Sequence, residues 1–205
     1  MKAAKRIVLV FLLATMLATS TQAQRFQLSL GYNAAVPLSE SFKEYVSKTS
    51  FRGMQGAVLY SINDKFRIGL QATYNDFYEK FDRQVYKGSD GSDISTVLSN
   101  TLQTTPLLVK GEYSFSKQSR IQPYVGLGAG INFVNFEQYL GEFPYSRYYT
   151  KAAFSGDVGV VVPFKTGSAY GFRLSTSYNL QPFDDEGVSN INTWNVQAGV
   201  VIPLK

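Results

Sequence analysis

The longest regular pattern in the sequence is an alternation of apolar with small or polar residues between Ile121 and Phe136. One face carries Ile, Pro, Val, Leu, Ala, Ile and Phe, whereas the other carries Gln, Tyr, three Gly and Asn. Successive side chains of a β-strand point to opposite sides, so this period of two predicts an extended strand. An apolar face opposite a tiny or polar face suits a wall between lipid and a tight polar interior, where glycines make room for bulky neighbours.

The same alternation predicts eight strands along the chain. They are expected at residues 25–36, 52–62, 66–75, 101–115, 121–136, 150–164, 169–181 and 191–204. The connections alternate between long and short, as in transmembrane barrels, where one rim has short turns and the other has longer loops. The expected long loops are residues 37–51, 76–100, 137–149 and 182–190. The pattern predicts an all-β fold, namely an eight-stranded antiparallel up-and-down transmembrane β-barrel with both termini on the short-turn side.

Aromatic residues on the apolar faces gather near the strand ends. Those near the short turns or the N-terminal strand are Phe26, Tyr60, Phe66, Phe115, Phe164 and Tyr170, and those near the long loops are Tyr74, Phe133, Phe154, Tyr178 and Trp194. Two aromatic belts that flank an aliphatic band are typical of the two membrane interfaces. Prolines also stay near strand ends, where a missing N–H disturbs the ladder least, but Pro106 has no obvious place in this pattern.

The N-terminus has the layout of a secretory signal peptide. Three basic residues precede the apolar run Ile7–Ala18, and Thr21-Gln22-Ala23 supplies a small-x-small exit. We therefore expect residues 1–23 to be a signal peptide cleaved after Ala23, and residues 24–205 to form the barrel domain. The apolar run of 12 residues is too short for a membrane-spanning helix, which needs about 20.

Cleavage changes the interpretation of the charge. The full sequence has 20 basic and 15 acidic residues, and three of the basic ones lie in the leader. The mature chain then holds 17 basic residues against 15 acidic ones, so the pI near 9.3 gives no reason to expect nucleic acid as a partner.

A soluble eight-stranded barrel would show the same period, so the composition of the polar face decides between them. A periplasmic, lipocalin-like carrier of a small apolar ligand would turn its polar face to water, and that face should be rich in Lys and Glu. Here the polar face is mainly Gly, Ser, Thr, Asn and Gln, and charged residues concentrate in the loops. This composition favours the membrane barrel.

Two segments carry a resemblance to known proteins. Pro123–Gly130, PYVGLGAG, and Thr105–Lys110, TPLLVK, resemble strands of the eight-stranded outer-membrane β-barrel families. These families include the outer-membrane protein A, X and W groups and the Bacteroidetes-type "porin family" β-barrel domain. The resemblance implies a place in the outer membrane of a Gram-negative envelope. Its implied partners are outer-membrane lipid or lipopolysaccharide and, during biogenesis, the barrel-assembly machinery.

The composition argues against an enzyme. The chain has no His, the side chain best suited to move protons near neutral pH, and no Cys for thiol or thiolate chemistry. We therefore expect no catalytic residues, no cofactor and no metal site. The acidic stretches Asp90-Gly91-Ser92-Asp93 and Asp184-Asp185-Glu186 offer oxygen ligands, but neither has the spacing of a calcium loop, and solvated loop tips are the default interpretation.

Five charged residues fall on the predicted inner face. They are Arg67, Lys110, Glu112, Asp157 and Arg173. Because an eight-stranded barrel is barely wide enough for its own side chains, we expect a salt-bridged plug in which the two carboxylates compensate the three cations. The alternative is a narrow path or gate for ions and small solutes.

The third long loop is the best candidate for a contact surface. It contains Phe143, Tyr145, Arg147, Tyr148 and Tyr149, and exposed aromatic and Arg side chains are enriched at binding hot spots. The alternative is that Tyr148 and Tyr149 extend the aromatic belt. The sequence thus predicts a non-enzymatic outer-membrane barrel with a structural or surface-interaction role toward an unidentified ligand or protein. A narrow pore and a soluble carrier are the alternatives.

Overall fold

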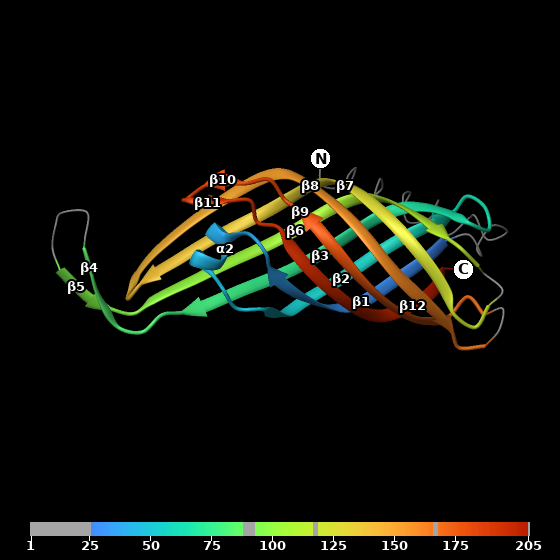
Figure 1. Cartoon of the computed structure of the whole chain (residues 1–205), viewed down its shortest axis with the longest axis horizontal. Coiled ribbons are helices and arrows are strands. Elements are labelled where there is room, and N and C mark those ends of the chain that lie inside the picture. Colours follow the sequence, from blue (N-terminus) through green and yellow to red (C-terminus); the bar gives the residue numbers. More distant parts are fainter. Residues whose placement is uncertain (1–25, 88–92, 117–118, 166–167, 205) are drawn as a thin grey trace, which may run out of the picture.

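A computed structural model describes residues 26–87, 93–116, 119–165 and 168–204 of the 205-residue chain. Eight strands close into one antiparallel barrel in the order β1-β12-β9-β8-β7-β6-β3-β2 (Figure 1). They are β1 (Phe26–Pro37), β2 (Ser50–Ser61), β3 (Phe66–Lys80), β6 (Leu98–Ser114), β7 (Gln122–Leu140), β8 (Phe143–Pro163), β9 (Gly171–Leu180) and β12 (Thr193–Leu204). The predicted eight-stranded barrel is confirmed. The predicted signal peptide, residues 1–23, lies outside the described residues.

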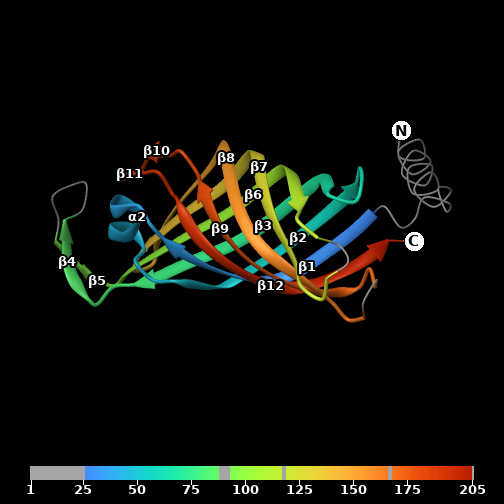
Figure 2. The ribbon, with the colours of Figure 1, turned by 45° about the vertical axis from the view of Figure 1, so that its right-hand side comes forward.

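The seam of the barrel joins its first and last strands. β1 pairs with β12 from Phe26 opposite Leu204 to Pro37 opposite Thr193, without a register shift. The connections β2–β3, β6–β7 and β8–β9 and the end of β12 lie at one rim, and the longer connections lie at the other (Figure 2). Both ends of the barrel therefore lie on the short-turn side, as expected for an even number of strands.

The faces of the strands are assigned as predicted. Apolar side chains point away from the barrel, among them Leu127, which is 75% exposed, whereas the inner positions are buried and mostly polar. Neighbouring aromatic rings pack outside the barrel near the short turns, with centroids of Phe26 and Tyr60 4.9 Å apart and those of Phe164 and Phe172 4.9 Å apart. A soluble carrier would need the opposite orientation, so that alternative is wrong.

The long connections contain more regular structure than predicted. The first holds a short helix, α2 (Glu40–Tyr45), the second a hairpin of β4 (Gln84–Lys87) and β5 (Asp93–Thr96), and the fourth a hairpin of β10 (Asp184–Asp185) and β11 (Val188–Ser189). The prediction of irregular chain over these residues was wrong there. These pieces are short, and outside the membrane no lipid face imposes a long apolar alternation.

The third connection departs most from the prediction. Residues 137–149 are not a loop, because β7 and β8 continue as paired strands until Leu140 faces Phe143. Gly141 has φ +64°, the positive value that the first central residue of a tight two-residue hairpin turn requires. β3 and β6 also run past the predicted ends, pairing as far as Lys80 and Ser99. Four adjacent strands therefore form a tall wall on one side of the barrel.

Pro106 lies in the middle of β6, where its side chain is buried. The ladder between β6 and β3 is interrupted there, since the register passes from Leu107–Ala72 to Thr104–Asn75 without the two intervening pairs. On the other side, Pro106 stays opposite Asn132 of β7. The missing N–H is thus accommodated by a local gap toward β3.

Candidate functional site

The five predicted inner charges meet in one layer of the lumen, near the short-turn rim. Nη2 of Arg67 lies 3.1 Å from Oε2 of Glu112, and Nζ of Lys110 lies 3.2 Å from Oε1 of Glu112. Nζ of Lys110 also lies 3.0 Å from Oδ2 of Asp157, and Arg173 forms a short ion pair with Glu112. All five side chains are buried. The structure thus brings the whole predicted set into a single network, which we call the charged layer.

Glycines on neighbouring strands make room for the charged layer. Gly126 faces Glu112 on one side and Asp157 on the other. A Cβ atom at Gly126 would stand 2.6 Å from Oδ1 of Asp157 and 3.0 Å from Cε of Lys110. The small residues of the PYVGLGAG strand are therefore needed for lumen packing, as the alternation suggests.

Tyr124 is a member of the charged layer that sequence reasoning missed. Its ring is 1% exposed and lies under two guanidinium groups, with its centroid 4.2 Å from Cζ of Arg173 and 5.9 Å from Cζ of Arg67. A Cβ atom at Gly159 would lie 2.6 Å from the Tyr124 hydroxyl, so this glycine accommodates the ring. The detectable signal was an aromatic residue at an inward position of β7, the strand between those that carry Glu112 and Asp157.

Neutral amide and hydroxyl groups fill the lumen above the charged layer. Asn195 Nδ2 donates to Asn33 Oδ1 at 3.1 Å, and Asn75 Nδ2 donates to Thr104 Oγ1 at 3.0 Å. Asn33 also donates a short hydrogen bond to Asn75, which joins the two pairs. These side chains come from four different strands, so the network crosses the lumen.

An apolar cluster closes the end of the lumen opposite the short turns. We call it the cap; its buried members are Ala35, Phe42, Tyr45, Val46, Phe77, Leu102, Val134, Phe136, Phe183, Val188 and Ile191. Helix α2 contributes Phe42 and Tyr45, whose rings pack 5.0 Å from Phe77 and 4.2 Å from Phe136. The carbonyl of Tyr45 accepts a hydrogen bond from Asn100 at 2.9 Å. The cap was not predicted, because no lumen-facing apolar cluster was expected from an alternating sequence.

The predicted contact surface is divided by the structure. Phe143, Tyr145, Arg147 and Tyr148 are exposed on β8, with Tyr148 77% exposed. Tyr149 instead packs against the cap, its ring centroid 5.2 Å from that of Phe183. Tyr149 is half-buried and does not face the lipid side, because the odd positions of β8 within the barrel, such as Asp157 and Ser155, point inward.

Glu186, between β10 and β11, links this hairpin to the wall. It accepts a hydrogen bond from the Tyr145 hydroxyl at 2.9 Å and one from the Tyr149 hydroxyl. The bond to Glu186 raises the pKa of Tyr149 to about 12, because loss of the proton would place two negative charges together. Asp185 pairs with Lys151. Two of the three acidic residues at 184–186 are thus engaged by the protein itself.

An open pocket of about 600 Å³ lies beside this link. Its lining residues are Lys151, Ala152, Pro182, Phe183, Asp184, Ser189 and Asn190. Across the described residues, no group of three or more His, Cys, Asp or Glu side chains could hold a metal ion. Asp90-Gly91-Ser92, the start of the other acidic stretch, lies outside the part of the chain that the structure describes.

A sequence model of one protein family, described as "Outer membrane protein beta-barrel domain", matches residues 7–201. The chain belongs to this family. Its location is therefore the outer membrane, as predicted. Among curated proteins, no relative is detected by sequence.

Solved outer-membrane barrels share the fold. Neisserial surface protein A has a TM-score of 0.58 at 18% identity, covering 87% of this chain and 97% of its own. Outer membrane protein OprG from Pseudomonas aeruginosa has a TM-score of 0.54 at 14% identity, covering 88% and 95%. Ail of Yersinia pestis, in complex with the heparin analogue sucrose octasulfate, has a TM-score of 0.50 at 17% identity, covering 87% and 98%. At these identities the likeness shows the fold alone.

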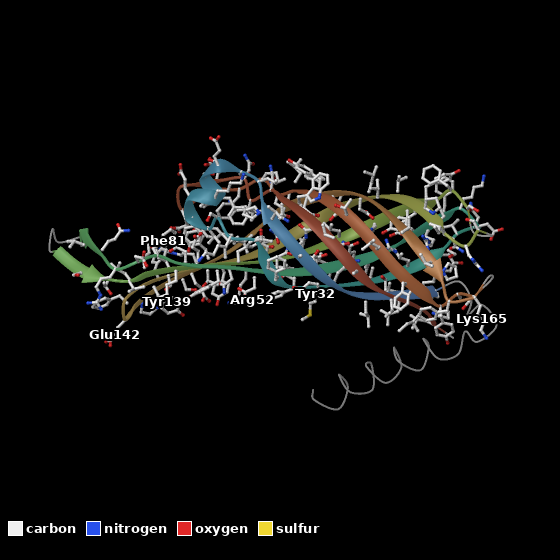
Figure 3. The ribbon with its side chains drawn as sticks, turned by 60° about the horizontal axis from the view of Figure 1, so that its bottom comes forward. Tyr32, Arg52, Phe81, Tyr139, Glu142 and Lys165 are labelled. Atoms are coloured by element: carbon white, nitrogen blue, oxygen red, sulfur yellow. The ribbon has the colours of Figure 1, made fainter. Side chains whose placement is uncertain are left out.

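The tip of the wall of this outer-membrane barrel protein lies far from the short-turn rim. Glu142 and Tyr139, at the tip of the β7–β8 hairpin, lie at the opposite end of the molecule from Lys165 in the β8–β9 turn (Figure 3). Within the described ranges, no helix is both long and apolar enough to cross a bilayer.

Proposed function

We propose that the protein is a non-enzymatic outer-membrane barrel that holds an interaction surface above the membrane. One observation carries the proposal: β7 and β8 contain 19 and 21 residues, whereas β9 and β12, the next two strands around the barrel after β8, contain 10 and 12. A tilted strand crosses the membrane with about 9–11 residues, so roughly ten residues of β8 are left to extend beyond it. An extension of this kind has no role in closing the barrel.

The outer part of β8 is an edge strand. β8 pairs with β9 only from Phe154 onward, so in the described structure Phe143–Ala153 has a strand partner, β7, on one side alone. The free side of such a strand presents backbone N–H and C=O groups to which an extended peptide can add. We infer that this edge and its exposed side chains form one contact surface.

The exposed side chains suit binding. Phe143, Tyr145 and Tyr148 are large and rigid, so they lose little conformational entropy when a partner covers them. Arg147 donates from Nε to the Tyr145 hydroxyl at 3.2 Å, and Tyr145 is held in turn by Glu186. These contacts keep part of the surface in a fixed conformation before binding, which lowers the entropic cost of binding.

The lumen supports a structural interior over a pore. The charged layer, the amide groups and the cap cross it in succession, and the charged groups are committed to one another. The lack of any His in the chain removes the usual proton-transfer residue of an outer-membrane hydrolase. We therefore assign the five charges to stability and the function to the outer wall.

In vivo photo-crosslinking tests the proposed contact surface. A photoreactive phenylalanine analogue is placed at Phe143 or Tyr148 in separate cell strains, and a matched control carries it at the lipid-facing Leu127. We expect one discrete protein or glycan adduct from positions 143 and 148 under conditions of cell contact, and none of this kind from position 127. Equal adduct patterns at all three positions, or none at the two tip positions, would contradict the proposal.

A further inference from the structure

The charged layer contains more positive than negative charge. Arg67, Lys110 and Arg173 are opposed by Glu112 and Asp157, and each of the five is at most 5% exposed. No other charged residue of the described part of the chain is buried to this degree. With ordinary protonation, the layer therefore has a net charge of +1. A buried charge without a counter-charge is strongly unfavourable, so a compensating negative charge is expected nearby.

A small cavity with both polar and apolar lining residues adjoins this layer. Its volume is about 10 Å³, and its lining residues are Ser29, Gly31, Gln55, Arg173, Ser175, Gln197, Ala198 and Gly199. A cavity of this size has room for about one water-sized particle. Its walls supply a guanidinium group, side-chain amides and hydroxyls, but no carboxylate. Such a lining attracts an anion and repels a cation.

Arg173, the guanidinium group in the cavity lining, retains a donor for such an anion. Within the described structure, the buried Nε atoms of Arg173 and Arg67 have no hydrogen-bond partner. The terminal nitrogens of Arg173 are directed to Glu112, at the other end of the same planar group. Arg173 therefore belongs both to the charged layer, through Glu112, and to the lining of the cavity.

We propose that this cavity binds one monovalent inorganic anion, chloride under cellular conditions, which balances the third cation of the lumen. The ligand is monatomic because the space admits no larger group. The Arg173 guanidinium supplies the charge, and Gln55 and Ser29 are neighbouring polar groups of the lining. The ion stabilises the folded barrel and takes no part in contacts of the outer wall, so this site is independent of the surface function proposed above.

Anion-dependent unfolding tests the site. The barrel is folded in phosphatidylcholine vesicles, and urea unfolding is followed by fluorescence of Trp194, the single tryptophan. Sodium chloride is compared with sodium gluconate at constant ionic strength, so that screening is the same in both series. The unfolding equilibrium constant should fall about tenfold for each tenfold rise in chloride above its dissociation constant. Equal stability in chloride and gluconate would overturn the proposal, because the cavity would then hold water only.

A charge placed in the cavity should replace the ion. Gln55→Glu keeps the shape of the side chain and supplies a carboxylate, so we expect it to abolish the chloride dependence and to raise the stability in gluconate. Gln138→Glu makes the same chemical change near the outer end of β7, away from the cavity, and should leave the chloride dependence intact. Persistent chloride dependence in folded Gln55→Glu would contradict the assignment of the cavity.

A direct measurement covers the case in which Gln55→Glu does not fold. Crystals of the unaltered protein grown in sodium bromide should show one anomalous-scattering peak next to Arg173. The absence of a bromide peak in the cavity would overturn the proposal, whatever the variants do.

Discussion

Arg67 on β3 and Glu112 on β6 are directly opposite in the strand register, and their charged groups approach to 3.1 Å. The same carboxylate also contacts Lys110 and Arg173. One buried carboxylate therefore pairs with three cations that come from three strands. If Glu112 were neutralised, Asp157 would be the only carboxylate left in the charged layer. The charged layer depends more on Glu112 than on any of its cations.

Glu112→Gln should consequently lower the free energy of unfolding by about 3–5 kcal/mol, because it leaves buried cations without their main partner. Urea unfolding in phosphatidylcholine vesicles measures this change. The control is Glu79→Gln at the outer rim, where the exposed carboxylate accepts a hydrogen bond from Ser47, and where the loss should be about 0.5–1.5 kcal/mol. Unchanged unfolding of Glu112→Gln would argue against a salt-bridged plug.

Two glycines in the wall should respond very differently to the same substitution. A Cβ atom at Gly130 would stand 2.1 Å from the carbonyl oxygen of Leu107, a backbone atom fixed by the ladder, whereas nothing lies within 4 Å of one at Gly111. Gly130→Ala should cost about 1–3 kcal/mol of stability and Gly111→Ala less than about 0.5 kcal/mol. Urea unfolding of the two variants measures the difference. Similar costs would show that the close approach at Gly130 is easily relieved.

The absence of Cys makes the orientation in the membrane directly measurable. Tyr148→Cys and Glu142→Cys should react with a membrane-impermeant maleimide in intact cells, because both positions lie on the outer part of the wall. Lys165→Cys, in a short turn, should react only after the outer membrane is permeabilised. The reverse pattern would place the wall in the periplasm.

The cap should be removable without opening the barrel. Phe42→Ala deletes a fully buried ring and should destabilise the packing of α2 by about 3–5 kcal/mol, so trypsin should cleave at Lys43 or Lys48 more rapidly. Because the charged layer still closes the lumen, planar-bilayer recordings should show no ionic current. Phe51→Ala, at a side chain that is 66% exposed, is the control and should cleave at the normal rate. A steady current through Phe42→Ala would favour the pore.

The link between Tyr149 and Glu186 predicts a late tyrosine titration. The pKa of Tyr149 is raised from 10.0 to about 12, so the folded state holds this proton more tightly than the unfolded state. The stabilisation is present below pH 10 and is lost as the pH rises toward 12. The tyrosinate absorbance of the folded protein, minus that of Tyr149→Phe, should show the late step, and Glu186→Gln should move it back toward pH 10. The same midpoint in both backgrounds would exclude Glu186 as its cause.

The membrane-spanning part of the fold could be predicted from the sequence because contact with lipid requires an alternation of apolar residues. Every second residue must be apolar there, so strand positions and the inward direction of Arg67, Lys110, Glu112, Asp157 and Arg173 follow from a period of two. Which of these charges touch one another depends on strand register, and a single sequence does not encode that register openly. The apposition of Arg67 with Glu112 became visible only in the folded barrel.

Above the membrane no lipid contact requires this alternation of apolar residues. Tyr145, Arg147 and Tyr148 face water on either side of the sheet, so no apolar alternation marks the continuing strand. Helix α2 is six residues long, too short for a 3.6-residue periodicity to be recognised. The inward position of Tyr149 could have been found by counting outward from Asp157 in steps of two, had the strand been extended past Thr150.

The uninterrupted pairing of β1 with β12 has a kinetic consequence. These strands are separated by most of the chain, yet they are hydrogen-bonded neighbours over their whole length. The barrel cannot close until its last strand has arrived, so closure must follow synthesis of the entire domain and carries the largest loop-closure entropy of any strand pair. Until that moment both strands present unpaired edges, and the half-formed sheet is at its greatest risk of aggregation.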